Sequence, residues 1–321
     1  MHFDVFNGDA DGLCALLQLR LDKPQDSVLV TGVKRDISLL NKVQVKAVDS
    51  VTVLDVSLEK NITALERILS QGASVFYVDH HRSGDIPQHS QLETRINTDA
   101  NICTSLLVDQ LLEGRYRAWA VTAAFGDNML DSAKQNAACL NLTEQKLDVL
   151  KELGVCINYN GYGGSLDDLH FLPDELYQQM LPYSSPFDFI VDNNDIYQQL
   201  RSGYYEDMAK AKAISATIEN DGIALYILPD EVWSRRVGGV FGNELANAYP
   251  NRAHAVLTTN AQGAYMVSVR APLVNKEGAD TLCASFATGG GRKGAAGINH
   301  LPVNDLERFI SCFSKQYSDA C

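Results

Sequence analysis

Acidic and imidazole side chains follow four separate apolar runs of this sequence. In the segment FNGDADG, Asp9 and Asp11 stand one residue apart. Later apolar runs end at Asp55, at the triplet Asp79, His80 and His81, and at Asp127. Carboxylates gathered in one place repel each other unless a cation lies among them. Together these residues predict a divalent metal site, with enough carboxylates for two ions. Oxygen and imidazole ligands without cysteine favour manganese over structural zinc.

These residues stand where the strands of a parallel sheet are expected to end. Residues 2–6, 50–54 and 74–78 are short runs rich in valine and phenylalanine, which is typical of buried strands. Helical patterns at 11–21 and 58–72 separate the runs. This alternation predicts an α/β fold with a doubly wound, mostly parallel sheet. In such sheets ligands bind at the carboxyl ends of the strands.

Each aspartate has a second interpretation, as the N-cap of the helix that follows it. Capping explains any one of them, but it does not explain why the set recurs after successive apolar runs. Asp127 differs from the others because it ends the longer segment 118–126, which is compatible with a helix or a strand. We expect it to lie near the same edge of the sheet.

The motifs DADG, VLDVS, VDHH and FGDN, in this order, resemble the four motifs of the DHH phosphoesterase superfamily. That superfamily includes RecJ-type exonucleases, nanoRNA and 3'-phosphoadenosine-5'-phosphate hydrolases, and cyclic-dinucleotide phosphodiesterases. Nearer the other end, RRVGGVFGNELANAY, YMVSVRAP and FATGGGRKGAAGINHLP resemble the family's C-terminal substrate-binding domain. The resemblance therefore covers both ends of the chain.

The resemblance implies a role for each residue of the metal site. It implies these ligands of two Mn²⁺ ions: Asp9 for the first ion, Asp11, His80 and Asp127 for the second, and Asp55 between the two. Asp79 and His81 would be catalytic groups that orient their neighbours or face the substrate.

One position departs from the family pattern. Many members have a histidine ligand of the first ion four residues before the first aspartate, where this chain has Val5. Asn7 is the polar residue nearest to that position, and its amide oxygen is a possible substitute. The first ion is therefore expected to bind more weakly than the second.

The segment GGGRKG at residues 289–294 has the composition of a phosphate cradle. Successive glycines, Gly290 and Gly291 among them, let backbone N–H groups approach an anion, and Arg292 and Lys293 add positive charge. The family usually has histidine where Arg292 stands, so this chain keeps anion binding but loses a titratable group. The alternative is a tight turn with two solvated cations.

Arg270 lies in an alternating run that we expect to be an edge strand. The resemblance makes it a substrate-binding arginine, and the alternative is an ordinary surface residue. Asn243, Lys34 and Arg35 are weaker candidates for substrate binding.

The chain is expected to have two domains. Residues 1–190 form the predicted catalytic domain, which includes a Gly/Asp-rich loop at 159–175. Residues 191–220 are expected to be a connecting helix, and residues 221–321 a smaller α/β substrate-binding domain.

Composition limits the partners and the compartment. The net charge is −13 for 321 residues, and residues 1–200 carry 15 Lys and Arg against 28 Asp and Glu. The acidic excess disfavours long nucleic acids, whose binding depends on many phosphate contacts. Seven cysteines without a C-x-x-C pair indicate reduced thiols. With no membrane-length apolar stretch and no secretion signal, a cytoplasmic protein is expected.

The metal site and the resemblance together imply a manganese-dependent phosphoesterase that acts on short oligonucleotides and releases 5'-mononucleotides. Alternatives within this class are a phosphatase of 3'-phosphoadenosine-5'-phosphate and a cyclic-dinucleotide phosphodiesterase. An alternative of another class is a non-catalytic nucleotide sensor, which Val5 and Arg292 leave open. The residues alone do not rank these substrates.

Overall fold

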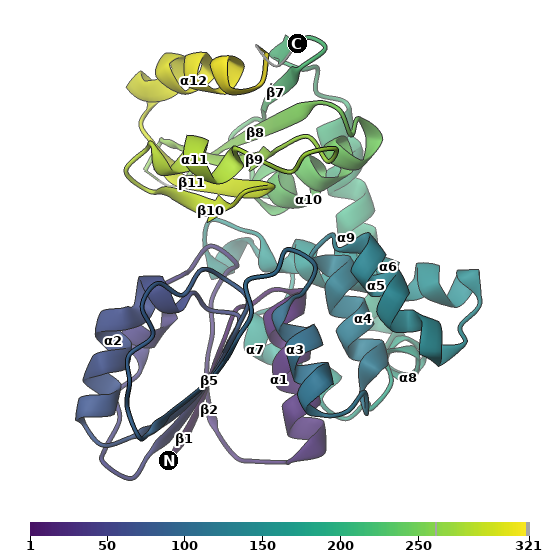
Figure 1. The fold of residues 1–321 in the computed structure, drawn as a ribbon. Coiled ribbons are helices and arrows are strands. Elements are labelled where there is room, and N and C mark those ends of the chain that lie inside the picture. Colours follow the sequence, from purple (N-terminus) through teal and green to yellow (C-terminus); the bar gives the residue numbers. More distant parts are fainter. Residues whose placement is uncertain (261, 319–321) are drawn as a thin grey trace. The chain divides into compact units, whose positions relative to one another are not determined.

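The structure, a computed structural model, describes residues 1–260 and 262–318 and divides the chain into two compact units (Figure 1). The first unit contains Met1–Gly161 and Leu169–Arg201. The second contains Tyr162–Asp168 and the chain from Ser202 on. The middle of the loop expected at 159–175 therefore groups with the second unit.

A five-stranded parallel sheet forms the centre of the first unit. In spatial order its strands are β2 (Val28–Val30), β1 (His2–Phe6), β3 (Ser50–Leu54), β4 (Ser74–Asp79) and β5 (Leu92–Ile96). The apolar runs lack alternation because helices cover both faces of a sheet of this kind. The predicted doubly wound parallel sheet is confirmed.

Helix α2 (Leu58–Ser70) covers one face of this sheet and packs with Phe3, Val5 and Val53 in one core. Figure 1 shows α1 (Ala10–Asp22) on the opposite side of the strands. The remaining helices of the unit are α3 (Thr104–Leu111), α4 (Arg117–Gly126), α5 (Leu130–Ala137), α6 (Glu144–Gly161), α7 (Pro173–Met180) and α8 (Pro186–Asp192). Asp127 thus follows a helix, not a strand.

The second unit is built on a mixed six-stranded sheet. Its spatial order is β10 (Gly289–Arg292), β11 (Ala295–Leu301), β9 (Tyr265–Arg270), β8 (Ala253–Thr259), β7 (Ile223–Ile227) and β6 (Ile218–Glu219). Strands β7 and β8 are parallel, and α10 (Val232–Ala248) connects them; the other neighbours are antiparallel. The predicted smaller α/β domain is confirmed at the level of its fold.

Different helices cover the two faces of this second sheet. Residues of α11 (Ala279–Ala284) and α12 (Leu306–Ser318), such as Phe309, share a core with Leu225 and Val267. The alternate strand residues face α10, as shown by the ring contact of Tyr226 with Phe241 at 5.3 Å.

Two expectations about this part of the chain are wrong. Arg270 ends β9, which lies between β11 and β8 and is not an edge strand. The alternation of its run arises from the two differently packed faces of an interior strand. The helix expected at 191–220 is shorter: α9 spans Asn194–Lys212, and Ile218–Glu219 form strand β6. The β-branched residues Ile214, Thr217 and Ile218 favour an extended chain there.

Among the described residues, no helix combines the length and apolar character that crossing a membrane requires.

A buried histidine in β8 makes the stability of the second unit depend on pH. His254 is fully buried, and burial, with the charge of Arg252, lowers its pKa from 6.5 to about 4. The neutral ring's contribution to stability is therefore complete above the unfolded pKa of 6.5 and is lost as pH falls toward about 4.

We expect His254→Leu to remove this dependence. Between about pH 7 and about pH 5, the wild-type free energy of unfolding should fall by about 2 kcal/mol more than that of the variant. Urea denaturation at the two pH values measures both changes. Equal losses in the two proteins would show that His254 does not titrate as its burial implies.

Candidate metal centre

The sheet register of the first unit places three polar residues of the site side by side. Phe6 pairs with Leu54, and Leu54 pairs with Val78. The next residues of the three neighbouring strands, Asn7, Asp55 and Asp79, therefore form one row at the carboxyl edge of the sheet. This is the edge at which parallel sheets bind ligands.

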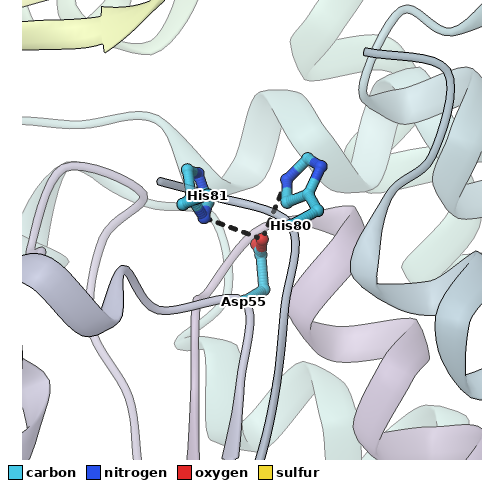
Figure 2. Close-up of side chains that lie close together, drawn as sticks. All are labelled: Asp55, His80 and His81. Atoms are coloured by element: carbon cyan, nitrogen blue, oxygen red, sulfur yellow. Dashed lines mark ion pairs between the residues drawn. The ribbon is translucent and has the colours of Figure 1, made fainter. Parts of the chain in front are cut away.

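Asp55 has an unusual backbone conformation, which lies at the centre of the site. Its φ is 57°, in the left-handed region that Asp and Asn adopt more readily than most other residues. Its carboxylate lies 3.3 Å from His80 Nε2 and 3.7 Å from His81 Nδ1 (Figure 2). A strained backbone at such a position is typical of functional sites.

The hydrogen bonds of the two histidines define which nitrogen carries the proton. His80 Nδ1 lies 2.8 Å from the carbonyl oxygen of Ile102, which can only accept a hydrogen bond. His80 Nδ1 therefore donates to this oxygen, and Nε2 is the atom that faces the carboxylates and could bind a metal ion, as in metal-bound histidines. His81 Nδ1 lies 2.8 Å from Asp79 Oδ1, which favours a lone pair on Nε2 there as well.

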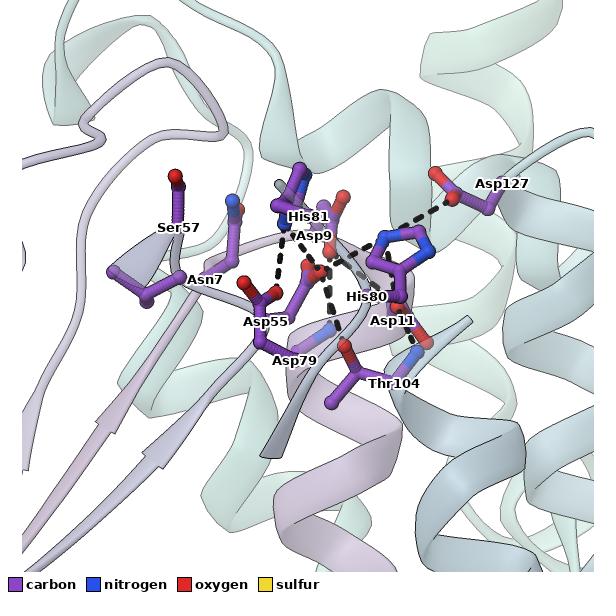
Figure 3. A network of polar contacts seen from close by, with 12 residues as sticks. Asn7, Asp9, Asp11, Asp55, Ser57, Asp79, His80, His81, Thr104 and Asp127 are labelled. Atoms are coloured by element: carbon purple, nitrogen blue, oxygen red, sulfur yellow. Dashed lines mark hydrogen bonds and ion pairs between the residues drawn. The ribbon is translucent and has the colours of Figure 1, made fainter. Parts of the chain in front are cut away.

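Asp9 and Asp11 are both anchored by backbone N–H groups (Figure 3). Asp9 is the N-cap of α1 and accepts from the N–H groups of Asp11 and Gly12, at 3.0 and 3.1 Å. Asp11 accepts from Thr104 and Ser105 at the start of α3, at 2.8 and 2.7 Å. Asp9 can therefore cap α1 and belong to the site at the same time.

Asp127 joins the cluster from the carboxyl end of α4. One of its oxygens, Oδ2, lies 3.9 Å from His80 Nε2, and the other, Oδ1, accepts from Lys34 Nζ at 3.1 Å. The same ammonium donates to Asp9 Oδ2 and, at 3.1 Å, to Asn158 Oδ1 of α6. Lys34 therefore lies inside the carboxylate cluster.

The pKa values of two carboxyls reflect their burial and the neighbouring negative charges. Burial and then the charges of Asp127 and Asp9 raise the pKa of Asp11 to about 6. Burial, Asp9 and Asp11 likewise raise the pKa of Asp55 well above its ordinary value. A cation bound among the carboxylates would favour their charged forms and so oppose both shifts.

Two groups of side chains have the geometry to hold an ion: Asp55 with His80 and His81, and Asp11 with His80 and Asp127. In each group the possible ligand atoms lie within 4.8 Å of one another. Two further oxygens, Asn7 Oδ1 and Asp79 Oδ2, are buried without a hydrogen-bond partner among the described residues. Oxygen and imidazole donors of this kind fit Mn²⁺.

In the second unit, two of the predicted substrate residues contact each other. Arg270 Nε donates to Asn243 Oδ1 at 2.6 Å, and Arg270 Nη2 donates to the carbonyl oxygen of Gly239 at 3.1 Å. Both partners belong to α10, so the guanidinium is held over the sheet face that this helix covers.

The glycine-rich segment forms strand β10 and its turn into β11, with Arg292 at the end of β10. Gly291 has a φ of 142°, and a Cβ there would lie 2.5 Å from the backbone of Ala296. A Cβ on Gly290, by contrast, would meet no atom of the described residues within 4 Å. Lys293 is exposed and lies 3.5 Å from Glu277.

Sequence reasoning treated Lys34 as a weak substrate candidate and missed Thr104, Ser105 and Asn158. Lys34 follows β2, so the strand-end argument that found the aspartates applies to it as well. Thr104 and Ser105 carried a weaker signal, as the expected start of a helix. Asn158 lies in the last turn of the long helix α6 and follows no strand, so the strand-end argument does not apply to it.

Comparison with solved structures identifies the fold. A DHH-domain protein described as a member of a family of ribosomal proteins matches with a TM-score of 0.69 and 14% identity, over 98% of this chain and 85% of that chain. The exonuclease RecJ bound to manganese matches with a TM-score of 0.63 and 14% identity, over 98% and 89%. The chain has the DHH fold.

A pGpG-specific phosphodiesterase from Vibrio cholerae shares the DHH fold with this chain. It matches with a TM-score of 0.52 and 14% identity, over 98% of each chain. The sequence itself matches no protein-family model and no curated protein. The resemblance noted in the sequence is therefore confirmed for the fold, and the activity has to be argued from the site.

Proposed function

We propose that this protein is a manganese-dependent phosphoesterase that hydrolyses short oligonucleotides to 5'-mononucleotides. The observation that carries the proposal is the set of three carboxylates, Asp11, Asp55 and Asp127, around the Nε2 atom of His80. The DHH fold supports it, since this fold occurs in an exonuclease bound to manganese and in a pGpG-specific phosphodiesterase.

In this proposal Asp11, Asp55, His80 and Asp127 surround the metal ion, and Asp9 belongs to the same carboxylate cluster. Bound Mn²⁺ would supply an acidified water as nucleophile and neutralise charge on the scissile phosphate. The chain contributes the fixed positions of its ligands: Asp11 is held by two backbone N–H groups, and His80 by the carbonyl oxygen of Ile102. Both anchors keep a ligand atom directed at the centre of the site.

His81 is proposed as the group that transfers a proton. Its side chain is 33% exposed, whereas those of Asp55, Asp79 and His80 are buried. A phosphate ester entering from solvent can therefore contact His81. Asp79 holds Nδ1, so that Nε2 is the atom that would exchange a proton with the leaving oxygen.

We further propose that Arg270, Asn243, Gly290, Gly291, Arg292 and Lys293 bind the phosphates or bases of the substrate. The open space at Gly290 supports this, because the packing of the chain does not require glycine there. A glycine that the fold does not need lets an anion approach the backbone closely. Asn243 would serve by fixing the guanidinium of Arg270.

A hydrolase specific for dinucleotides or other small nucleotides is the second candidate. It is favoured by the pGpG-specific phosphodiesterase that shares the fold over 98% of both chains. Both candidates agree with the acidic excess of residues 1–200, which disfavours long nucleic acids.

A substrate panel with added Mn²⁺ tests the proposal. The panel contains linear dinucleotides and trinucleotides of RNA and DNA, a cyclic dinucleotide and 3'-phosphoadenosine-5'-phosphate. We expect 5'-mononucleotides from the linear substrates and no product in excess chelator. Hydrolysis confined to the bisphosphate or the cyclic dinucleotide would replace the oligonucleotide assignment. Absence of hydrolysis across the panel would favour a nucleotide sensor.

A further inference from the structure

Lys34 occupies a position between carboxylates that a cation would otherwise take. An ammonium has three N–H donors, and three oxygens accept from Lys34 Nζ, on Asp9, Asp127 and Asn158. These residues come from the start of α1, the end of α4 and the last turn of α6. The side chain of Lys34 is only 21% exposed, so its charge acts on the cluster with little screening by water.

The negative charge of Asp9 is already stabilised by groups of the chain itself. Its Oδ1 caps α1 and its Oδ2 accepts from the ammonium. Among the described residues, Asp9 belongs to neither of the groups that can hold an ion. Val5, on the strand that leads to Asp9, is fully buried in the core beneath α2 and offers no ligand atom.

Asp127 connects the ammonium to the rest of the centre. Its Oδ1 accepts from Lys34, while its Oδ2 faces His80 in the group with Asp11. Asp127 therefore lies between two positions for a cation. The Lys34 ammonium occupies the position at Oδ1, and a metal ion could occupy the position at Oδ2. A metal ion bound to Asp9 and Asp127 would need the oxygens that Lys34 uses, and it would repel the ammonium.

We propose that Lys34 is a built-in cation of this centre, and that the site consequently binds one divalent ion, at the Nε2 atom of His80, which both ion-binding groups share. The inference rests on the proposed metal-dependent function and corrects the two-ion site that the family resemblance implies. Lys34 is then a positioning residue, which holds Asp9 and Asp127 in place and balances part of the charge.

The test is the number of Mn²⁺ ions bound per chain, measured by titration calorimetry and equilibrium dialysis. The wild type should bind one ion, with the electron paramagnetic resonance spectrum of an isolated Mn²⁺. Lys34→Met keeps the length of the side chain and removes its charge, and it should bind a second, weaker ion. Lys42→Met is the matched control, because Lys42 is half exposed and pairs with Asp36 outside the site.

Asp9→Asn provides an independent variant that does not depend on the folding of Lys34→Met. If Asp9 pairs with Lys34 and does not bind the ion, Asp9→Asn should still bind one Mn²⁺ ion, with an affinity within about tenfold of the wild type. Asp11→Asn should lose Mn²⁺ binding. Two ions in the wild type, or one ion in both wild type and Lys34→Met, would overturn the role of Lys34 and leave a metal-dependent phosphoesterase intact. Absence of any bound ion would overturn both proposals.

Discussion

Asp55→Asn is expected to lower kcat/KM by about 1,000-fold or more, equivalent to about 4 kcal/mol of transition-state stabilisation. The Asp55 carboxylate lies 3.3 Å from His80 Nε2, the atom of the histidine that both ion-binding groups share. Asparagine has the same size and also tolerates the left-handed backbone of this position, so the variant removes charge without straining the chain.

Measurements of metal affinity and of stability distinguish a role of Asp55 in metal binding from a purely structural role. Mn²⁺ should bind Asp55→Asn at least about 100-fold more weakly than the wild type. In chelator the variant should be as stable as the wild type or more so, because burial and neighbouring carboxylates already disfavour the charged form of Asp55. Asp85→Asn, at an exposed aspartate, is the control. Wild-type turnover by Asp55→Asn would rule out the proposed centre.

Gly154→Ala is expected to destabilise the first unit by about 2–3 kcal/mol. A Cβ on Gly154 of α6 would lie 2.0 Å from the carbonyl oxygen of Thr122 in α4. The facing position is also glycine, since a Cβ on Gly126 would lie 2.6 Å from the carbonyl oxygen of Gly154. The two helices therefore contact each other through their backbones, and this contact positions Asp127.

Urea denaturation measures the loss of stability, and calorimetry measures the effect on the site. Mn²⁺ affinity should fall together with stability, because moving α4 displaces Asp127. Lys151→Ala, at an exposed position of the same helix, should change stability by less than about 0.5 kcal/mol. A Gly154→Ala protein as stable as Lys151→Ala would mean that α4 and α6 do not need this close approach.

The sequence predicted those residues of the site whose positions depend only on where a strand ends. Asp55 and Asp79 follow apolar runs, and in a parallel sheet the ends of neighbouring strands lie side by side. Strand order and register then place Asn7 in the same row. No knowledge of helix packing is needed for these positions.

The remainder of the site depends on tertiary packing. Asn158 contacts the centre because α6 lies against α4 at a pair of glycines, and Lys34 reaches it across the sheet edge from β2. In the second unit, the alternation around Arg270 indicated a two-faced strand but not its place in the sheet. Sequence periodicity describes one element at a time, whereas these contacts arise between elements.

The most direct test of the central claim is the rate of hydrolysis as a function of substrate length, with Mn²⁺ and at fixed salt. Labelled single strands from dinucleotides to long oligonucleotides are compared, with a parallel series in excess chelator. We expect the highest kcat/KM for roughly two to five nucleotides, 5'-mononucleotides as products and no reaction in chelator. Long strands degraded as fast as dinucleotides, without inhibition by salt, or hydrolysis that persists in chelator, would contradict the account.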